Sequence, residues 1–90
     1  MLISEFEWDD ETARHVARHG LDAARLDGML SSRITVVRNK RRLSGLYKFI
    51  GTETGGQVAT VVVARTSVRG RWRPVTGWRS TDAEKAIHGR

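Results

Sequence analysis

The segment that most constrains this fold is residues 57–66, which reads as a single buried strand. Apolar side chains stand at both odd and even positions along it, including the unbroken run of residues 61–64, so both faces are expected to be covered. A turn with paired glycines precedes it at residues 52–56, and another turn follows at residues 67–70. Since turns this short join antiparallel neighbours, we expect the segment to be the central strand of a meander.

The flanking segments supply the other expected strands. Residues 34–38 are short and β-branched, residues 43–51 alternate aromatic and polar side chains, and residues 71–78 follow the second turn. Pro74 in the last of these indicates an edge position or a bulge, because proline has no N–H to donate to a neighbouring strand. Residues 5–8 alternate acidic and aromatic side chains, as in a short opening strand.

Helix signals occupy the N-terminal third of the chain. Acidic residues begin a segment of helical periodicity at residues 11–19, where they interact favourably with the helix dipole. Gly20 follows as a left-handed C-cap, which glycine adopts without steric cost. Asp22 can then cap a second short helix at residues 23–30, whose apolar side chains share one face.

The expected fold is a small two-layer α+β domain, with a meander of three to four antiparallel strands and helices on one face. Thr81 and Glu84 have the spacing of a capping box, so a short C-terminal helix is expected to run to about His88. Residues 1–90 form a single domain, because a chain this short has no room for a second core. The face without helices would be available to a ligand.

Charge is the first clue to function. The chain carries 16 Lys and Arg against 10 Asp and Glu, and residues 31–90 hold most of the bases, which favours a polyanionic partner or an acidic protein partner. It has no cysteine, so disulfides, thiolate catalysis and cysteine-bound zinc are excluded. No apolar run is long enough to cross a bilayer and the N-terminus does not resemble a signal peptide, so we expect a cytoplasmic protein without membrane association.

Two basic clusters could form an anion-binding surface. In the last strand Arg71, Arg73 and Arg79 share one parity, while Trp72 and Trp78 share the other, so the tryptophans could pack inward beneath an exposed row of guanidinium groups. Arginines also keep exposed strand edges soluble, and that alternative is equally open. The second cluster is Lys40, Arg41 and Arg42, which a solvated loop would explain as well. Aromatic residues of the strands could stack on bases, although such residues more often form the core.

His15 and His19 lie four residues apart, on one face of the first expected helix. That spacing could present two imidazoles to a metal, but Val16 stands where a metalloprotease helix would carry its glutamate. Two exposed helical histidines are the simpler interpretation, with His19 near the helix C-terminus. We expect no metal and no cofactor.

The motifs of the chain resemble a known family. The string Phe6-Glu7-Trp8-Asp9, followed by a helix that ends Arg18-His19-Gly20-Leu21, resembles the opening of BrnT toxins. The Ile50-Gly51-Thr52 segment is similar to a strand of that family, and residues 73–84 resemble its closing arginine-rich strand and Thr-x-x-Glu helix start. The resemblance covers nearly the whole chain in order.

This resemblance implies a fold similar to the RelE group of type II toxins, which are bacterial ribonucleases that slow growth by cutting RNA. It also implies a co-expressed BrnA-like antitoxin protein. The antitoxin, and not this chain, would contact DNA. The chain departs from the family pattern at three positions. Trp78, followed by Arg79, stands where the closing arginine would fall, Leu46 replaces an arginine, and His15 replaces an asparagine.

The leading hypothesis is a metal-independent endoribonuclease toxin, in which cationic side chains stabilise the charge that develops on phosphate when the RNA 2′-hydroxyl attacks. Arg65 and Arg73 are the expected phosphate ligands, with Arg79 as a replacement for the missing arginine, and His19 or Lys48 as proton-transfer groups. The expected RNA-binding residues are Lys40, Arg41, Arg42 and Arg71. Two alternatives are a basic RNA- or protein-binding module without catalysis, and a structural subunit whose basic surface meets a partner chain.

Overall fold

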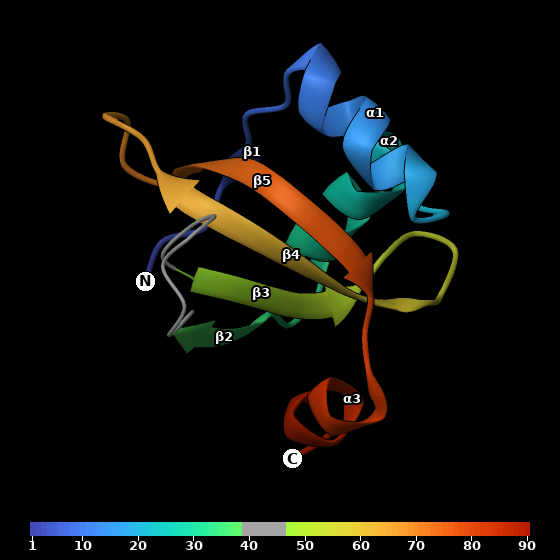
Figure 1. The fold of residues 1–90 in the computed structure, drawn as a ribbon. Coiled ribbons are helices and arrows are strands. Elements are labelled where there is room, and N and C mark those ends of the chain that lie inside the picture. Colours follow the sequence, from blue (N-terminus) through green and yellow to red (C-terminus); the bar gives the residue numbers. More distant parts are fainter. Residues whose placement is uncertain (39–46) are drawn as a thin grey trace.

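The computed structural model describes residues 1–38 and 47–90, which fold into a five-stranded mixed sheet with helices (Figure 1). The strand order is β1-β5-β4-β3-β2. In chain order the elements are β1 (Glu5–Phe6), α1 (Asp10–Arg18), α2 (Ala23–Leu26), the 3-10 helix η1 (Asp27–Ser31), β2 (Thr35–Arg38), β3 (Tyr47–Thr52), β4 (Val58–Arg65), β5 (Arg71–Arg79) and α3 (Asp82–His88).

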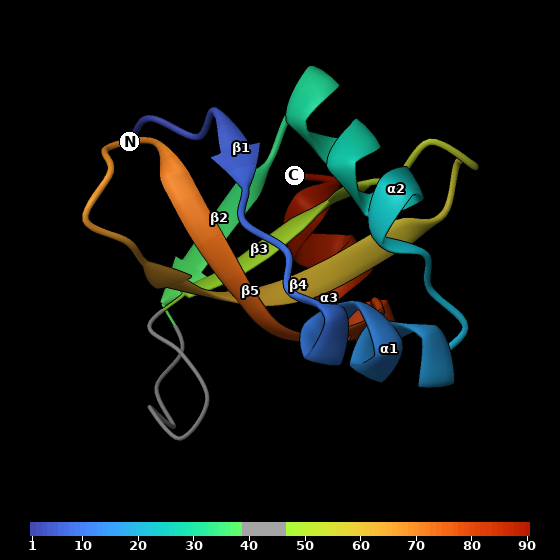
Figure 2. The same cartoon turned by 90° about the horizontal axis from the view of Figure 1, so that it is seen from above.

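The four strands β2 to β5 form the expected antiparallel meander, with β4 between β3 and β5. The fifth strand was not expected in this place: β1 pairs in parallel with the other edge of β5, through Glu5 with Arg71 and Phe6 with Trp72. Figure 2 shows β1 alongside β5 at one edge of the sheet. The sheet is therefore mixed and has one strand more than the meander of three to four strands that the sequence predicts.

Local signals fix the ends of the helices. The Asp9 carboxylate caps α1 by accepting a hydrogen bond from the Thr12 backbone at 2.7 Å, and Asp22 caps α2 by accepting from Ala24 at 2.9 Å. Gly20 has φ +76°, the left-handed conformation expected after the first helix. The expected second helix is divided, because its second half is the 3-10 helix η1.

One face of the sheet and the first three helical segments enclose the main core. Ala59, Val61 and Val63 of β4 point to this face together with aromatic side chains of β1, β3 and β5. The helical side contributes four fully or almost fully buried apolar side chains, Val16, Leu21, Leu26 and Met29. At about 25 cal/mol for each Å² of buried apolar surface, this packing is the main source of stability.

Helix α3 lies on the opposite face, so the expectation that all helices share one face is wrong (Figure 1). The indole Nε1 of Trp78 donates to Glu84 Oε1 at 2.9 Å, and Thr35 Oγ1 lies 2.8 Å from His88 Nδ1. The strand register puts Thr35 and Trp78 on the face turned away from Val61. The capping box is confirmed, with Thr81 and Glu84 capping each other at the start of α3.

A β-bulge in β5 reverses the alternation of side chains between the first and second parts of the strand. Val62 pairs with Thr76 but Val63 pairs with Pro74, so Val75 has no partner on β4. An inserted residue reverses the alternation of side chains, because the period of a strand is two. Pro74 predicted an edge or a bulge, and the bulge is found beside it.

Candidate nucleic-acid interface

Four strands of the meander meet at one end of the sheet, where they position a cluster of cationic and aromatic side chains. Strand β2 ends at Arg38, β3 begins at Tyr47, and these two residues pair in register. Strand β4 ends at Arg65, which pairs with Trp72 near the start of β5. We call this group, with Arg69 of the β4–β5 turn, the strand-end cluster: Arg38, Tyr47, Arg65, Arg69 and Trp72.

The Arg65 guanidinium is the centre of this cluster. Its Cζ lies 5.5 Å from the centre of the Tyr47 ring and 5.4 Å from the centre of the Trp72 ring. Its Nη2 donates a hydrogen bond of 3.1 Å to Tyr47 Oη, and the two rings meet edge to face at 5.7 Å. A guanidinium held against aromatic faces keeps its remaining N–H donors in a fixed plane, as recognition of phosphate requires.

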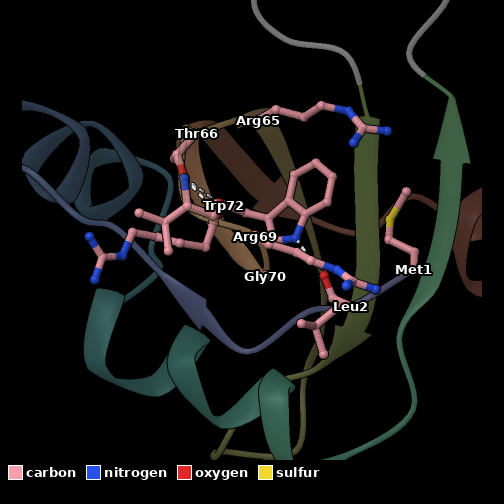
Figure 3. Close-up of a pocket in the computed structure, with 9 residues that line it drawn as sticks. Met1, Leu2, Arg65, Thr66, Arg69, Gly70 and Trp72 are labelled. Carbon is pink, nitrogen blue, oxygen red and sulfur yellow. Dashed lines mark hydrogen bonds between the residues drawn. The ribbon is translucent and has the colours of Figure 1, made fainter.

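A pocket of about 240 Å³ opens beside Arg65. Figure 3 shows the Trp72 indole between Arg65 and Thr66 on one side and Leu2 on the other. The indole Nε1 donates to the Leu2 carbonyl at 3.0 Å, so its polar group is satisfied within the protein. The other lining residues are Met1, Val68, Arg69, Gly70 and Arg71.

Positive charge at this end of the sheet is only partly neutralised. Glu5 Oε1 lies 2.7 Å from Arg71 Nε, and Glu7 Oε1 lies 3.9 Å from Arg71 Nη1, so Arg71 is held by carboxylates. Among the described residues Arg65 and Arg69 form no ion pair. The hydrogen bond from Arg65 and its positive charge lower the pKa of Tyr47 below the ordinary value of 10.0. This end of the sheet therefore offers guanidinium groups to an anion.

Lys48 lies elsewhere, on the face that carries α3. Its Nζ is 3.8 Å from Glu84 Oε2 and 5.5 Å from the centre of the Trp78 ring. Burial raises the pKa of Glu84, but hydrogen bonds from Thr81, Trp78 and Thr60 and the charge of Lys48 outweigh this and lower it below 4.5. We call this group the α3 network: Lys48, Thr60, Trp78, Thr81 and Glu84. Its charged and polar groups interact with one another.

The bulge overturns the expected arrangement of the last strand. Trp72 is 4% exposed in the main core, whereas Trp78 faces α3, so the two tryptophans do not share a face. Arg73 pairs with Ala64 and Arg79 pairs with Ala59, which puts these two arginines on opposite faces as well. The single row of guanidinium groups that the strand pattern predicts is not formed.

The strand register also gives Arg73 and Arg65 opposite facings, because Arg73 pairs with Ala64 and Arg65 pairs with Trp72. Arg73 lines a hollow beside α1 with His15 and Asp9. Hydrogen bonds from Thr12 lower the pKa of Asp9, and the charge of Arg73 contributes to this. The two expected phosphate ligands therefore line different hollows, Arg65 beside Trp72 and Arg73 beside α1.

Two other expected catalytic residues lie near the end of α1. Arg79 is beside Gly20, where a Cβ would come within 3.2 Å of Arg79 Nη2. His19 is exposed, and its ring centre lies 5.2 Å from that of His15. Within residues 1–38 and 47–90 no group of three or more potential metal-ligating His, Cys, Asp or Glu side chains occurs.

Two expectations remain: the second basic cluster, and the stacking of strand aromatic side chains on bases. Lys40, Arg41 and Arg42 lie outside the described part of the chain. Phe49 is fully buried and Trp72 almost so, and neither offers its ring face to a base from solution. Sequence reasoning missed Arg69, although Arg65 and Arg69 flank the same short turn and could have been grouped on that basis.

No helix in the described part of the chain is both long and apolar enough to cross a membrane. Comparisons of the chain with protein-family models, with curated proteins and with solved structures find no match.

Proposed function

We propose that the protein is the RNA-cleaving toxin of a type II toxin–antitoxin system, which acts in the cytoplasm without a metal and is held inactive by a BrnA-like antitoxin. The observation that carries the proposal is the Arg65 guanidinium, fixed over two aromatic rings and free of a carboxylate among the described residues. The motif order, from Phe-x-Trp-Asp to the Thr-x-x-Glu helix start, supports the family.

RNA cleavage of this type needs little from the protein. The RNA supplies the nucleophile, its 2′-hydroxyl, and the protein aligns that oxygen with the adjacent phosphorus and stabilises the added negative charge. Guanidinium groups supply such charge through paired hydrogen bonds. We assign the reacting phosphate to Arg65, with Arg69 on the neighbouring phosphate, because both belong to the strand-end cluster and line one pocket.

Arg73 therefore loses its role beside Arg65 in this proposal. Lys48 is a weaker candidate for proton transfer than its sequence position indicates, because Glu84 and Trp78 already engage its ammonium group. Lys40, Arg41 and Arg42 keep their expected role as contacts of the RNA backbone, which rests on their charge alone.

A second candidate function is RNA binding without cleavage. The observation that favours it is the residue at position 78, where the resemblance leads us to expect an arginine. The chain has Trp78 there, and its indole donates a hydrogen bond to Glu84 of α3. Such a module would bind RNA with strong salt dependence and release no product.

Incubation of purified, antitoxin-free protein with labelled single-stranded RNA in EDTA tests the proposal. Cleavage by the wild type is expected, with a loss of about 100-fold in Arg65→Ala, because removal of one charge-stabilising donor typically has that effect. Arg73→Ala is the matched control on the opposite face and is expected to retain activity within about threefold. RNA that stays intact with folded wild-type protein but still binds would establish the non-catalytic module instead.

A further inference from the structure

Tyr47 is the only tyrosine of the chain, and its hydroxyl lies at the centre of the strand-end cluster. Its Oη accepts a hydrogen bond from Arg65 Nη2, so the phenolic proton is directed away from Arg65 and is available to another acceptor. Register with Arg38 on one side and Val63 on the other fixes the backbone of Tyr47, and the edge-to-face contact with Trp72 fixes its ring.

The cleavage reaction has a second chemical requirement besides charge stabilisation. When the 2′-oxygen bonds to phosphorus, the bond from phosphorus to the 5′-oxygen breaks, and that oxygen leaves with an electron pair and needs a proton. None of the groups considered so far meets this need beside Arg65, because Lys48 lies in the α3 network and His19 lies at the end of α1.

We propose that the Tyr47 hydroxyl is the general acid that protonates the leaving 5′-oxygen, an inference that rests on the proposed ribonuclease function. The 2′-hydroxyl proton passes to water, the 2′-oxygen bonds to phosphorus, and the 5′-oxygen departs with the Tyr47 proton. The products are a 2′,3′-cyclic phosphate and a free 5′-hydroxyl. Water then returns a proton to the phenolate, so atoms and charge balance.

Arg65 makes this role chemically reasonable in two ways. Its hydrogen bond and charge favour the phenolate that proton donation leaves behind, and they lower the pKa of Tyr47. A phenol whose pKa is lowered gives up its proton more readily during the reaction than an ordinary phenol does. Because the proposal also assigns the reacting phosphate to Arg65, this one guanidinium would stabilise both the Tyr47 phenolate and the negative charge on the phosphate.

A pocket adjoins two side chains that hold the Tyr47 ring. Arg65 and Trp72, which contact that ring, line the pocket of about 240 Å³, which can receive the nucleotide next to the reacting phosphate. The cation–aromatic pair of Lys48 and Trp78 is not assigned a role in binding phosphate, because the Lys48 ammonium group already pairs with the Glu84 carboxylate.

The test compares the wild type with Tyr47→Phe, which keeps the ring and its packing but removes the proton. We expect Tyr47→Phe to bind RNA within about twofold of the wild type and to cleave it about 100-fold more slowly, and to lose the alkaline decline that ionisation of Tyr47 gives the wild-type rate. An RNA with sulfur in place of the leaving 5′-oxygen needs no protonation, so this substrate should restore the variant to within about threefold of the wild type.

Each outcome has a distinct meaning. If Tyr47→Phe cleaves ordinary RNA as fast as the wild type, or if the sulfur-containing RNA does not rescue it, Tyr47 is not the general acid, while the ribonuclease function stands. If the folded wild type cleaves neither RNA, the ribonuclease proposal itself fails and the role of Tyr47 fails with it. As a second measurement, the ultraviolet titration of the single phenol should shift to higher pH in Arg65→Ala, and an unchanged midpoint would contradict the pairing on which the role depends.

Discussion

The strand-end cluster and the α3 network contain the same local arrangement, a cation over an aromatic ring. Arg65 lies 5.5 Å from the Tyr47 ring centre, and Lys48 lies 5.5 Å from the Trp78 ring centre. The difference is the carboxylate, because Glu84 accompanies Lys48 at 3.8 Å, while Arg65 forms no ion pair among the described residues.

This comparison teaches that the surroundings of a cation, and not its residue type, decide what it does. In the α3 network the charge is used internally, where it helps to hold α3 against the sheet. In the strand-end cluster the charge remains available to an external anion. We therefore expect substitutions in the α3 network to change stability and substitutions of the arginines in the strand-end cluster to change RNA binding.

The largest effect is expected for Glu84→Ala. This change removes one half of a capping box and leaves the Trp78 indole N–H without its acceptor, so the free energy of unfolding should fall by about 2–3 kcal/mol. Urea denaturation measures the change. Glu84→Gln is the matched control, because glutamine can still complete the capping box, and it should lose less than half as much. An alanine variant as stable as the wild type would break the comparison.

The next effect is on RNA affinity. Arg65→Ala should weaken the binding of single-stranded RNA about tenfold and lower the slope of log Kd against log salt by about 0.7, because one phosphate contact is lost. Fluorescence anisotropy over a range of salt concentrations measures both quantities. Arg14→Ala, an exposed arginine of α1, is the control and should change neither. Equal losses in the two variants would mean that binding is not localised at the strand-end cluster.

Acid should weaken the protein partly through Glu84. Because its pKa is lowered in the folded protein, ionised Glu84 stabilises the fold at pH values above its ordinary pKa of 4.5, and this contribution is lost as the pH falls through the lower folded value. Denaturation midpoints between pH 7 and about pH 3 should therefore decline more steeply in the wild type than in Glu84→Gln. Parallel profiles would exclude Glu84 as a source of acid sensitivity.

The smallest effect is expected for Lys48→Met. The pair with Glu84 is long and partly exposed, with 32% of the Lys48 side chain accessible, so its loss should lower the free energy of unfolding by only about 0.5 kcal/mol. The RNA affinity of Lys48→Met should stay within about twofold of the wild type, whereas Arg65→Ala should lose RNA affinity. A large loss of RNA affinity in Lys48→Met would move the interface to the α3 face.

Features with local causes were predicted correctly. The Thr81 capping box, the left-handed Gly20 and the central position of β4 depend on residues within a few positions of each other or on one apolar run, so they can be read from a single segment. The site was predicted less completely. Arg65 and the flanking turn could be recognised, but the contact between Arg65 and Tyr47 joins residues that are 18 positions apart.

Features that depend on register were predicted incorrectly for one physical reason. One unpaired residue, Val75, reverses the facing of every later side chain in β5, so Trp78 and Arg79 exchange the faces that uninterrupted alternation assigns to them. The position of α3 follows from this reversal, because Trp78 anchors the helix on the face to which the bulge turns it.

The amino-acid sequence by itself determined the strand-forming segments, the helix caps and the excess of basic residues, since each arises from neighbouring side chains. Tertiary structure alone decided which cations have carboxylate partners. Pairing of β1 with β5 brings Glu5 to Arg71, and packing of α3 brings Glu84 to Lys48. Coulombic interactions fall off with distance and depend on solvent exposure, so the charges that remain free for an external anion are set by the folded arrangement.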